Sequence, residues 1–224
     1  MLLDLEPDID RSELAGISAD LETAHPRDVI EWAVRRFGRD LTIACSFQHC
    51  VIIDMAVEIN PDVEVLFLDT GYHFAETLAF VDDVRRRYEL NLRIQKPMPE
   101  AEGVLCGSQG CCDLRKVEPL NAALAGKRAW ISGLKRVDTD HRAEAPVVMW
   151  DGRRQMVKIN PLATWSDADV ENYVVRRALP VHPLVERGYL SIGCAPTTRP
   201  VSSQGNRRAG RWWGEAKTEC GLHL

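Results

Sequence analysis

Three features are missing from this chain of 224 residues: long apolar runs, an excess of basic charge and a secretory leader. No apolar run approaches the roughly 20 residues that a membrane-spanning helix needs. The net charge of −5 provides no global basic surface for nucleic acid. The first residues are acidic and lack the basic and apolar regions of a signal sequence. We therefore expect a cytoplasmic protein that binds neither membrane nor nucleic acid.

Cysteines, by contrast, are frequent, and they stand at positions 45, 50, 106, 111, 112, 194 and 220. An odd number of cysteines in a reducing compartment favours metal binding or catalysis over a disulfide framework. Cys111 and Cys112 are adjacent and cannot easily bond to each other, and with Cys194 they offer three thiolates. Iron–sulfur clusters and structural zinc sites usually take four ligands. Buried cysteines that act only as small apolar side chains are the simpler alternative.

Cys220 stands near the end of the chain, where packing is usually poor because chain ends are weakly ordered. A mobile tail suits a nucleophile that must visit two partners in turn, and an incidental thiol on a frayed end is the alternative. Lys217 and His223 favour the reactive thiolate form of Cys220, whereas Glu219 opposes it. The sequence therefore leaves the pKa of Cys220 open.

The middle of the chain alternates short apolar strands with helices. The expected strands are 41–45, 63–68, 92–94 and 129–132, and the expected helices between them are 51–56, 74–88 and 111–125. This alternation predicts an α/β protein with a parallel, twisted sheet and helices on both faces. Ligands bind such sheets at the carboxyl ends of the strands. Three polar loops fall there: 46–50, 69–73 and 133–142.

The flanking segments follow other patterns. Residues 1–38 are expected to be helical, with Pro26 near the start of a helix. Residues 157–162 are expected to be extended, and Ser166 is expected to cap a helix that runs to about residue 177.

Anion binding is the chemistry that the polar loops favour. Ser46 follows a strand and precedes a helix N-terminus, where backbone N–H groups attract anions, although a serine at this place is usually only a cap. The loop lacks the glycine spacing of a Walker loop, so a nucleoside triphosphatase is not expected. Arginines in loops suit phosphate or sulfate, with a solvated surface as the alternative. The basic residues concerned are Lys116, Lys135, Arg136, Arg142, Lys158, Arg199, Arg208 and Arg211.

Four stretches resemble signatures of the assimilatory sulfonucleotide reductases, the family of adenylylsulfate (APS) and phosphoadenylylsulfate (PAPS) reductases. These stretches are 69–77, 111–119, 133–143, and 208–213 together with 217–223. The resemblance covers nearly the whole chain from about residue 28. The cysteine pair at 111–112 is similar to that of the APS-using branch, which carries an iron–sulfur cluster.

The resemblance implies an adenine-nucleotide α-hydrolase-like fold, with a nucleotide-binding domain over residues 1–200 and a flexible catalytic tail over residues 201–224. It implies that the Cys220 thiolate attacks the sulfur of APS, AMP leaves, and thioredoxin or glutaredoxin releases sulfite from the S-sulfocysteine. A homo-oligomer is compatible with this reading. The substrate contacts that the resemblance implies are Ser46, Phe47, Thr70, Gly71, Lys116, Arg136, Arg142, Arg208 and Arg211.

The metal site departs from the family pattern. The cluster-bearing branch usually has Cys-x-x-Cys where this chain has Cys194 and then Thr197. The resemblance thus implies a 4Fe-4S cluster on Cys111, Cys112 and Cys194, with an open iron site, water, a Thr197 oxygen or Cys106 in the fourth position. Such a cluster should be labile, because a neutral hydroxyl is a poor substitute for a thiolate.

Other functions stay open at this stage. A Thr-Thr-Arg run, as at 197–199, is typical of PAPS reductases without a cluster, so PAPS reduction is the first alternative. A non-catalytic iron–sulfur or redox sensor on the same fold is the second alternative. A related adenylylating or ATP-pyrophosphatase enzyme is disfavoured, because its chemistry needs no nucleophile at Cys220.

Overall fold

The structure is a computed structural model that describes residues 10–201, 207–213 and 219–222. One six-stranded sheet has the order β3-β2-β1-β4-β6-β5, and its first five strands in that order run parallel. The last strand, β5, pairs with β6 in the antiparallel direction. The strands are β1 (Leu41–Ala44), β2 (Glu64–Leu68), β3 (Leu92–Gln95), β4 (Ala129–Ser132), β5 (Val148–Asp151) and β6 (Met156–Ile159).

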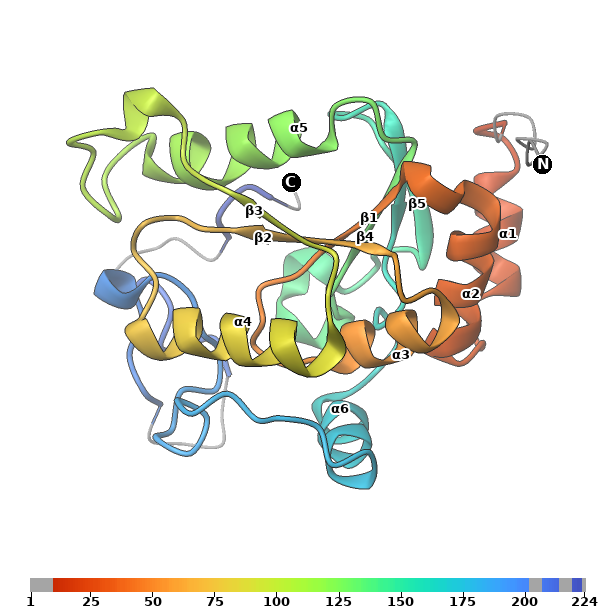
Figure 1. Ribbon diagram of the computed structural model, residues 1–224. Helices are drawn as coiled ribbons and strands as arrows, with labels where there is room; N and C mark the ends of the chain where they lie inside the picture. Colours follow the sequence, from red (N-terminus) through yellow and green to blue (C-terminus); the bar gives the residue numbers. More distant parts are fainter. Residues whose placement is uncertain (1–9, 202–206, 214–218, 223–224) are drawn as a thin grey trace.

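Helices cover both faces of the sheet, as the alternation of strands and helices predicted. In Figure 1, α3 and α4 lie below the sheet and α5 lies above it. Buried side chains fill both interfaces, with Phe67 and Phe80 on the α4 side and Leu66 and Leu120 on the α5 side. The helices are α1 (Leu14–Asp20), α2 (Pro26–Phe37), α3 (Val51–Ile59), α4 (Ala75–Tyr88), α5 (Glu118–Leu124) and α6 (Asp167–Arg176).

The helix starts follow local chemistry. Pro26 occupies the first turn of α2, where its missing N–H costs no hydrogen bond. Ser166 and Asp169 form a reciprocal capping box at the start of α6, which satisfies two backbone donors. Both helix starts confirm the sequence prediction.

The order of the strands positions the site. The chain builds outward from β1 through β2 to β3, and α5 then carries it back across the other face to β4, on the opposite side of β1. The strand order therefore reverses between β1 and β4, and such a reversal leaves a crevice at the carboxyl ends of the two strands. Ile43 of β1 lies beside Ile131 of β4 in this central pair.

Two features of the fold were not predicted. The antiparallel strand β5 escaped notice because its four residues alternate too briefly to give a clear pattern. The helix expected over 111–125 contains a π-helical turn, Asp113–Val117, before α5 begins. Such turns occur frequently at functional sites. Within the described residues, no helix is both long and apolar enough to cross a membrane.

Candidate active site

A cavity of about 230 Å³ opens at the carboxyl ends of β1 and β4. All three polar loops that the sequence placed at this edge contribute to its wall. Their lining residues are Ser46, Gln48 and His49 from the first loop, Thr70 and His73 from the second, and Gly133, Lys135, Asp138 and Arg142 from the third. The crevice that the strand order predicts is therefore a pocket to which all three polar loops contribute side chains.

Cys220 lines this pocket, and the described residues around it are docked against the domain. The backbone carbonyls of Gly221 and Leu222 accept hydrogen bonds from Arg153 and Arg154, each at 3.3 Å. Leu222 packs against the apolar cluster under α5. Lys217 and His223, which were expected to favour the Cys220 thiolate, lie outside the described residues.

Glu219 anchors this C-terminal segment (residues 219–222) through a buried ion pair. Its two carboxylate oxygens accept hydrogen bonds from Nε and Nη2 of Arg142, both at 2.7 Å. Thr139 donates a third hydrogen bond at 3.1 Å, and Arg208 Nη2 lies 3.6 Å away. Burial raises the pKa of Glu219, but Arg142 and Arg208 lower it by more, so Glu219 is ionised at neutral pH.

Three further cations line the pocket beside Cys220: Lys116, Arg208 and Arg211. Burial lowers the pKa of Lys116, while negative charge on the neighbouring sulfurs of Cys220 and Cys194 raises it by more, so Lys116 keeps its charge. Arg211 donates to the Ile192 carbonyl at 3.1 Å and lies 4.7 Å from the centre of the Trp212 ring. The pocket thus combines a nucleophilic thiol with cations suited to an oxyanion.

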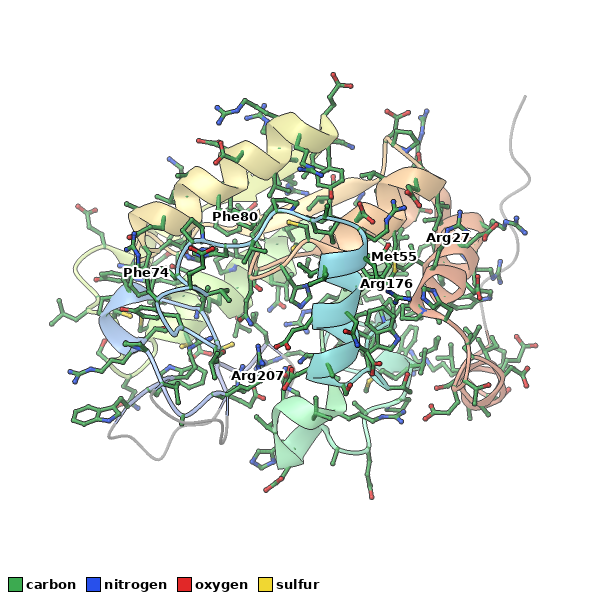
Figure 2. The ribbon with its side chains drawn as sticks, turned by 90° about the horizontal axis from the view of Figure 1, so that it is seen from below. Arg27, Met55, Phe74, Phe80, Arg176 and Arg207 are labelled. Carbon is green, nitrogen blue, oxygen red and sulfur yellow. The ribbon has the colours of Figure 1, made fainter. Side chains whose placement is uncertain are left out.

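The segment that carries these arginines is tied to the rest of the fold. Arg199 N donates to the Gly210 carbonyl at 2.9 Å and Trp212 N to the Thr197 carbonyl at 2.8 Å. Figure 2 shows Arg207 beside α6, where it pairs with Glu171. These contacts bring residues 207–213 to the pocket from far along the chain.

A second, smaller cavity adjoins the first. Its wall contains the four cysteines 106, 111, 112 and 194, together with Thr197. Lys116 lines both cavities and therefore lies between Cys220 and these thiols. Thr70 also connects them, because it lines the first cavity while its hydroxyl lies 3.5 Å from Cys194 Sγ.

The thiols suit an iron–sulfur cluster by donor type. A set of soft sulfur ligands selects zinc, copper or iron–sulfur clusters. Within the part of the chain that the structure describes, no three Cys, His, Asp or Glu side chains converge as a single metal ion would require. In a 4Fe-4S cluster each thiolate binds its own iron atom, so the donors need not converge on one point.

Comparison with known proteins decides the family. The family model for the phosphoadenosine phosphosulfate reductase domain matches residues 40–200. This chain belongs to the sulfonucleotide reductase family. It is 42% identical to the adenosine 5′-phosphosulfate reductase of Mycolicibacterium smegmatis, with 92% of each chain covered. It is also 42% identical to the phosphoadenosine 5′-phosphosulfate reductase of Gloeobacter violaceus, covering 96% of this chain and 95% of that one.

A solved structure supports the same assignment. The phosphoadenylyl-sulfate reductase of Candida auris superposes with a TM-score of 0.76 at 28% identity, covering 86% of this chain and 99% of that chain. The resemblance read from the four sequence stretches is therefore confirmed, as is the expected fold. As a member of this family, the chain is an oxidoreductase that acts on an adenosine phosphosulfate.

Most residues that the resemblance assigned to substrate meet at the pocket of this sulfonucleotide reductase. The ones that line it are Ser46, Thr70, Lys116, Arg142, Arg208 and Arg211, with Cys220. Phe47 is instead fully buried at a positive φ of 56° and packs edge-to-face on Phe67. Gly71 does not line the pocket; it follows Thr70 in a turn that its N–H closes onto Asp69 at 2.9 Å.

Arg136 also lies away from the pocket. Its guanidinium donates to both carboxylate oxygens of Glu22, at 2.5 and 2.9 Å, and to the Ala145 carbonyl at 2.9 Å. The structure thus corrects the position expected for this side chain: Arg136 ties its loop to the segment between α1 and α2.

Arg136→Ala provides a direct test of this placement. Because Arg136 holds a partly exposed ion pair, we expect the free energy of unfolding to fall by about 1 kcal/mol or less. We expect kcat/KM for sulfite release to fall by less than about threefold, well below the loss for a pocket arginine. Chemical denaturation and steady-state kinetics measure the two quantities. A hundredfold loss of kcat/KM would show instead that Arg136 contacts the substrate.

Some pocket residues were missed by reasoning from sequence. Gln48 accepts from Ile192 N at 3.0 Å and donates to the Leu190 carbonyl at 3.1 Å, which holds residues 190–192 over the first loop. The His73 ring packs at a tilt against Phe67, and its Nε2 atom lies 2.9 Å from the Leu68 carbonyl. Both lie in the polar loops that follow β1 and β2, and this place in the sequence is the signal that could have indicated them.

Gly193 is needed for the position of Arg211. A Cβ atom on Gly193 would lie 2.2 Å from Nη2 of Arg211, which is too close for any contact. We expect Gly193→Ala to displace the Arg211 side chain and to lower kcat/KM by about a hundredfold, as misplacement by about 1 Å can do. The control is the double variant Gly193→Ala/Arg211→Ala, which should be no slower than Arg211→Ala alone. Additive losses would show that Gly193 acts through another residue.

Proposed function

We propose that this chain reduces APS to sulfite and AMP during cytoplasmic sulfate assimilation, with a protein dithiol as reductant. The observation that carries the proposal is the position of Cys220: it lines the pocket at the β1–β4 crevice beside Lys116, Arg208 and Arg211. A thiol nucleophile and several cations around one cavity are the groups that attack on a phosphosulfate requires.

The nucleotide enters at the β1–β4 crevice. The first turn of α3 faces this edge and carries no side-chain cap, so its N–H groups are available to an anion. The cavity of about 230 Å³ is smaller than the range of roughly 300–1,000 Å³ that is typical of ligand pockets. The C-terminal segment fills part of the space, so this segment moves when the whole nucleotide binds.

The reaction proceeds in two displacements. The Cys220 thiolate attacks the sulfur of APS, the bond from that sulfur to the phosphate oxygen breaks, and AMP leaves with the electron pair. Lys116 and the pocket arginines offset the charge that builds on the phosphate. A thiolate of thioredoxin or glutaredoxin then attacks Cys220 Sγ and expels sulfite. The second thiol of the reductant resolves the mixed disulfide, so the dithiol supplies the two electrons.

An iron–sulfur cluster at the second cavity belongs to this proposal. Cys111, Cys112 and Cys194 supply three of its thiolates. When bound, the cluster would add an electron-rich group of sulfur and iron next to Lys116. The contribution of the chain itself is the ammonium of Lys116, which the fold holds between that cavity and Cys220.

PAPS is the alternative substrate, and the relatives favour neither nucleotide alone. The Mycolicibacterium smegmatis relative is named for the phosphosulfate without the 3′-phosphate, while the Gloeobacter violaceus relative at equal identity is named for PAPS. The paired cysteines at 111–112 favour APS. A non-catalytic iron–sulfur or redox sensor on the same fold predicts no sulfite release with either nucleotide.

Initial rates of sulfite release with APS and with PAPS test the proposal. Protein purified without oxygen is assayed with thioredoxin, and iron and acid-labile sulfide are measured on the same sample. Faster release from APS by iron-loaded protein is the expected result. Faster sulfite release from PAPS than from APS would identify PAPS as the substrate instead. Absence of sulfite with both nucleotides, from folded protein, would reject the enzyme in favour of the sensor.

A further inference from the structure

Cys106 lies next to Thr197, the residue at the position of the missing fourth cysteine. Its Sγ atom is 3.9 Å from the Thr197 hydroxyl, and Thr197 stands where the cluster-bearing relatives have a cysteine. Cys194, which precedes Thr197 by three residues, lines the same small cavity as Cys106. Cys106 is half-buried and lines the same small cavity as Cys111 and Cys112.

The loop that carries Cys106 is fixed in this position by side chains of the helix that follows it and of the 69–73 loop. Arg115 Nη2 donates to the carbonyls of Ala101 and Val104, at 2.6 and 3.1 Å. The Tyr72 hydroxyl donates to the same Val104 carbonyl at 3.0 Å. Gly107, at a φ of +88°, turns the chain directly after Cys106 toward Cys111. These hydrogen bonds fix the conformation of the loop, which therefore holds the Cys106 thiol at the cavity wall.

Thr197 is poorly suited to bind iron. Its hydroxyl donates to the Cys194 carbonyl at 3.4 Å, so its proton is engaged with the backbone. A neutral hydroxyl is also a harder and weaker donor than a thiolate toward iron in a cluster. The structure offers a sulfur donor within contact distance of the same place.

We propose that Cys106 is the fourth ligand of the cluster, so that the site is Cys106, Cys111, Cys112 and Cys194. This inference rests on the cluster of the proposed function and extends it, because the family pattern draws its last two thiolates from a single Cys-x-x-Cys turn. Here the fourth thiolate comes from the loop 102–110, which precedes the helix. Thr197 is tolerated because the neighbouring Cys106 supplies the thiolate that Thr197 lacks.

Iron and sulfide content of anaerobically purified variants tests the assignment. Wild-type protein should hold about four irons and four sulfides per chain. Cys106→Ala should lose most of both, together with the visible absorbance. Cys106→Ala/Thr197→Cys should regain them, because Thr197→Cys restores a thiol within reach of the same iron. Cys50→Ala is the matched control and should keep the wild-type content, since Cys50 is buried in the core and lines neither cavity.

The outcomes separate this inference from the proposed function. Wild-type iron and sulfide in Cys106→Ala, with unchanged circular dichroism, would overturn the assignment while leaving the cluster in place. A Cys106–Cys194 disulfide in iron-free wild-type protein would give the two thiols a redox role instead. Wild-type protein that releases sulfite but contains no iron or sulfide would reject the cluster and leave the cysteine chemistry of Cys220 standing. Loss of iron and sulfide in Cys106→Ala, with recovery of both in Cys106→Ala/Thr197→Cys, would establish Cys106 as the fourth ligand.

Discussion

Cys220→Ser should release no measurable sulfite from APS, with kcat falling at least about a thousandfold. The serine hydroxyl is not ionised at neutral pH and is a far weaker nucleophile than a thiolate. The change removes little of the pocket wall, so the dissociation constant of AMP should stay within about threefold. Rapid-quench assays of sulfite and calorimetric titration with AMP measure the two quantities.

The same mechanism predicts a covalent intermediate on Cys220 that can be detected directly. Wild-type protein mixed with APS and no reductant should gain the mass of one sulfonate group on the peptide that contains Cys220. Cys45 also lines the pocket and lies at the carboxyl end of β1. Cys45→Ser is therefore the control that tests whether this second thiol, rather than Cys220, takes the sulfonate. Sulfite release by Cys220→Ser at a tenth of the wild-type rate, or a sulfonate found on Cys45, would contradict the mechanism.

Arg142→Ala should release the C-terminal segment and slow the reaction by at least about a hundredfold. Arg142 is buried and forms two charge-assisted hydrogen bonds with Glu219, next to Cys220. Removal of one partner from a buried ion pair typically costs about 3–5 kcal/mol. Because this ion pair joins residues 219–222 to the 133–142 loop and Glu219 belongs to none of the hydrophobic core clusters, the expected response is undocking of the segment rather than global unfolding.

Alkylation of Cys220, followed by mass spectrometry of its peptide, measures that undocking. We expect the alkylation rate to rise at least about tenfold in Arg142→Ala. Arg142→Ala/Glu219→Ala should show no further rise, since the two residues act through one contact. Arg136→Ala is the control from the same loop. Equal alkylation rates in wild type and Arg142→Ala would show that other contacts hold the segment.

Acid should have the same effect as loss of Arg142. The pKa of Glu219 in the folded protein lies below its ordinary value of 4.5. A carboxyl group with a lowered pKa contributes stability above its unfolded pKa, and this contribution is lost as the pH falls through the folded pKa. The difference in free energy of unfolding between wild type and Glu219→Gln should therefore be constant above pH 4.5 and shrink below it. A difference that grows as the pH falls would contradict this assignment.

Local sequence patterns were sufficient for most of the fold. Short apolar strands and the start of α2 at Pro26 depend on side-chain period and backbone chemistry, which neighbouring residues determine. The prediction of three polar loops at one edge of the sheet followed from parallel strand direction alone. The strand β5 depends on pairing with β6, a contact between segments, and its own four residues carry too little pattern.

Site residues were predicted correctly where the residue type alone decides the role. The prediction failed where the role depends on the direction in which the side chain points. Cys220, Lys116 and Arg142 were identified and do line the pocket. Arg136 carries the same guanidinium as Arg142, six residues earlier in the sequence, yet its partner Glu22 holds it elsewhere. A motif specifies which residue is present, whereas packing decides the direction in which a side chain points.

The sequence by itself determined the family, the parallel α/β architecture and the set of reactive groups, because these depend on composition, period and motif. Only the tertiary structure decided that Glu219 is paired with Arg142 and that Cys106 meets Thr197 in a cavity that Cys194 also lines. Cys106 and Thr197 are 91 residues apart in the chain. No local preference links residues so distant; the folded backbone brings them together, and only then do the charges and thiols become a site.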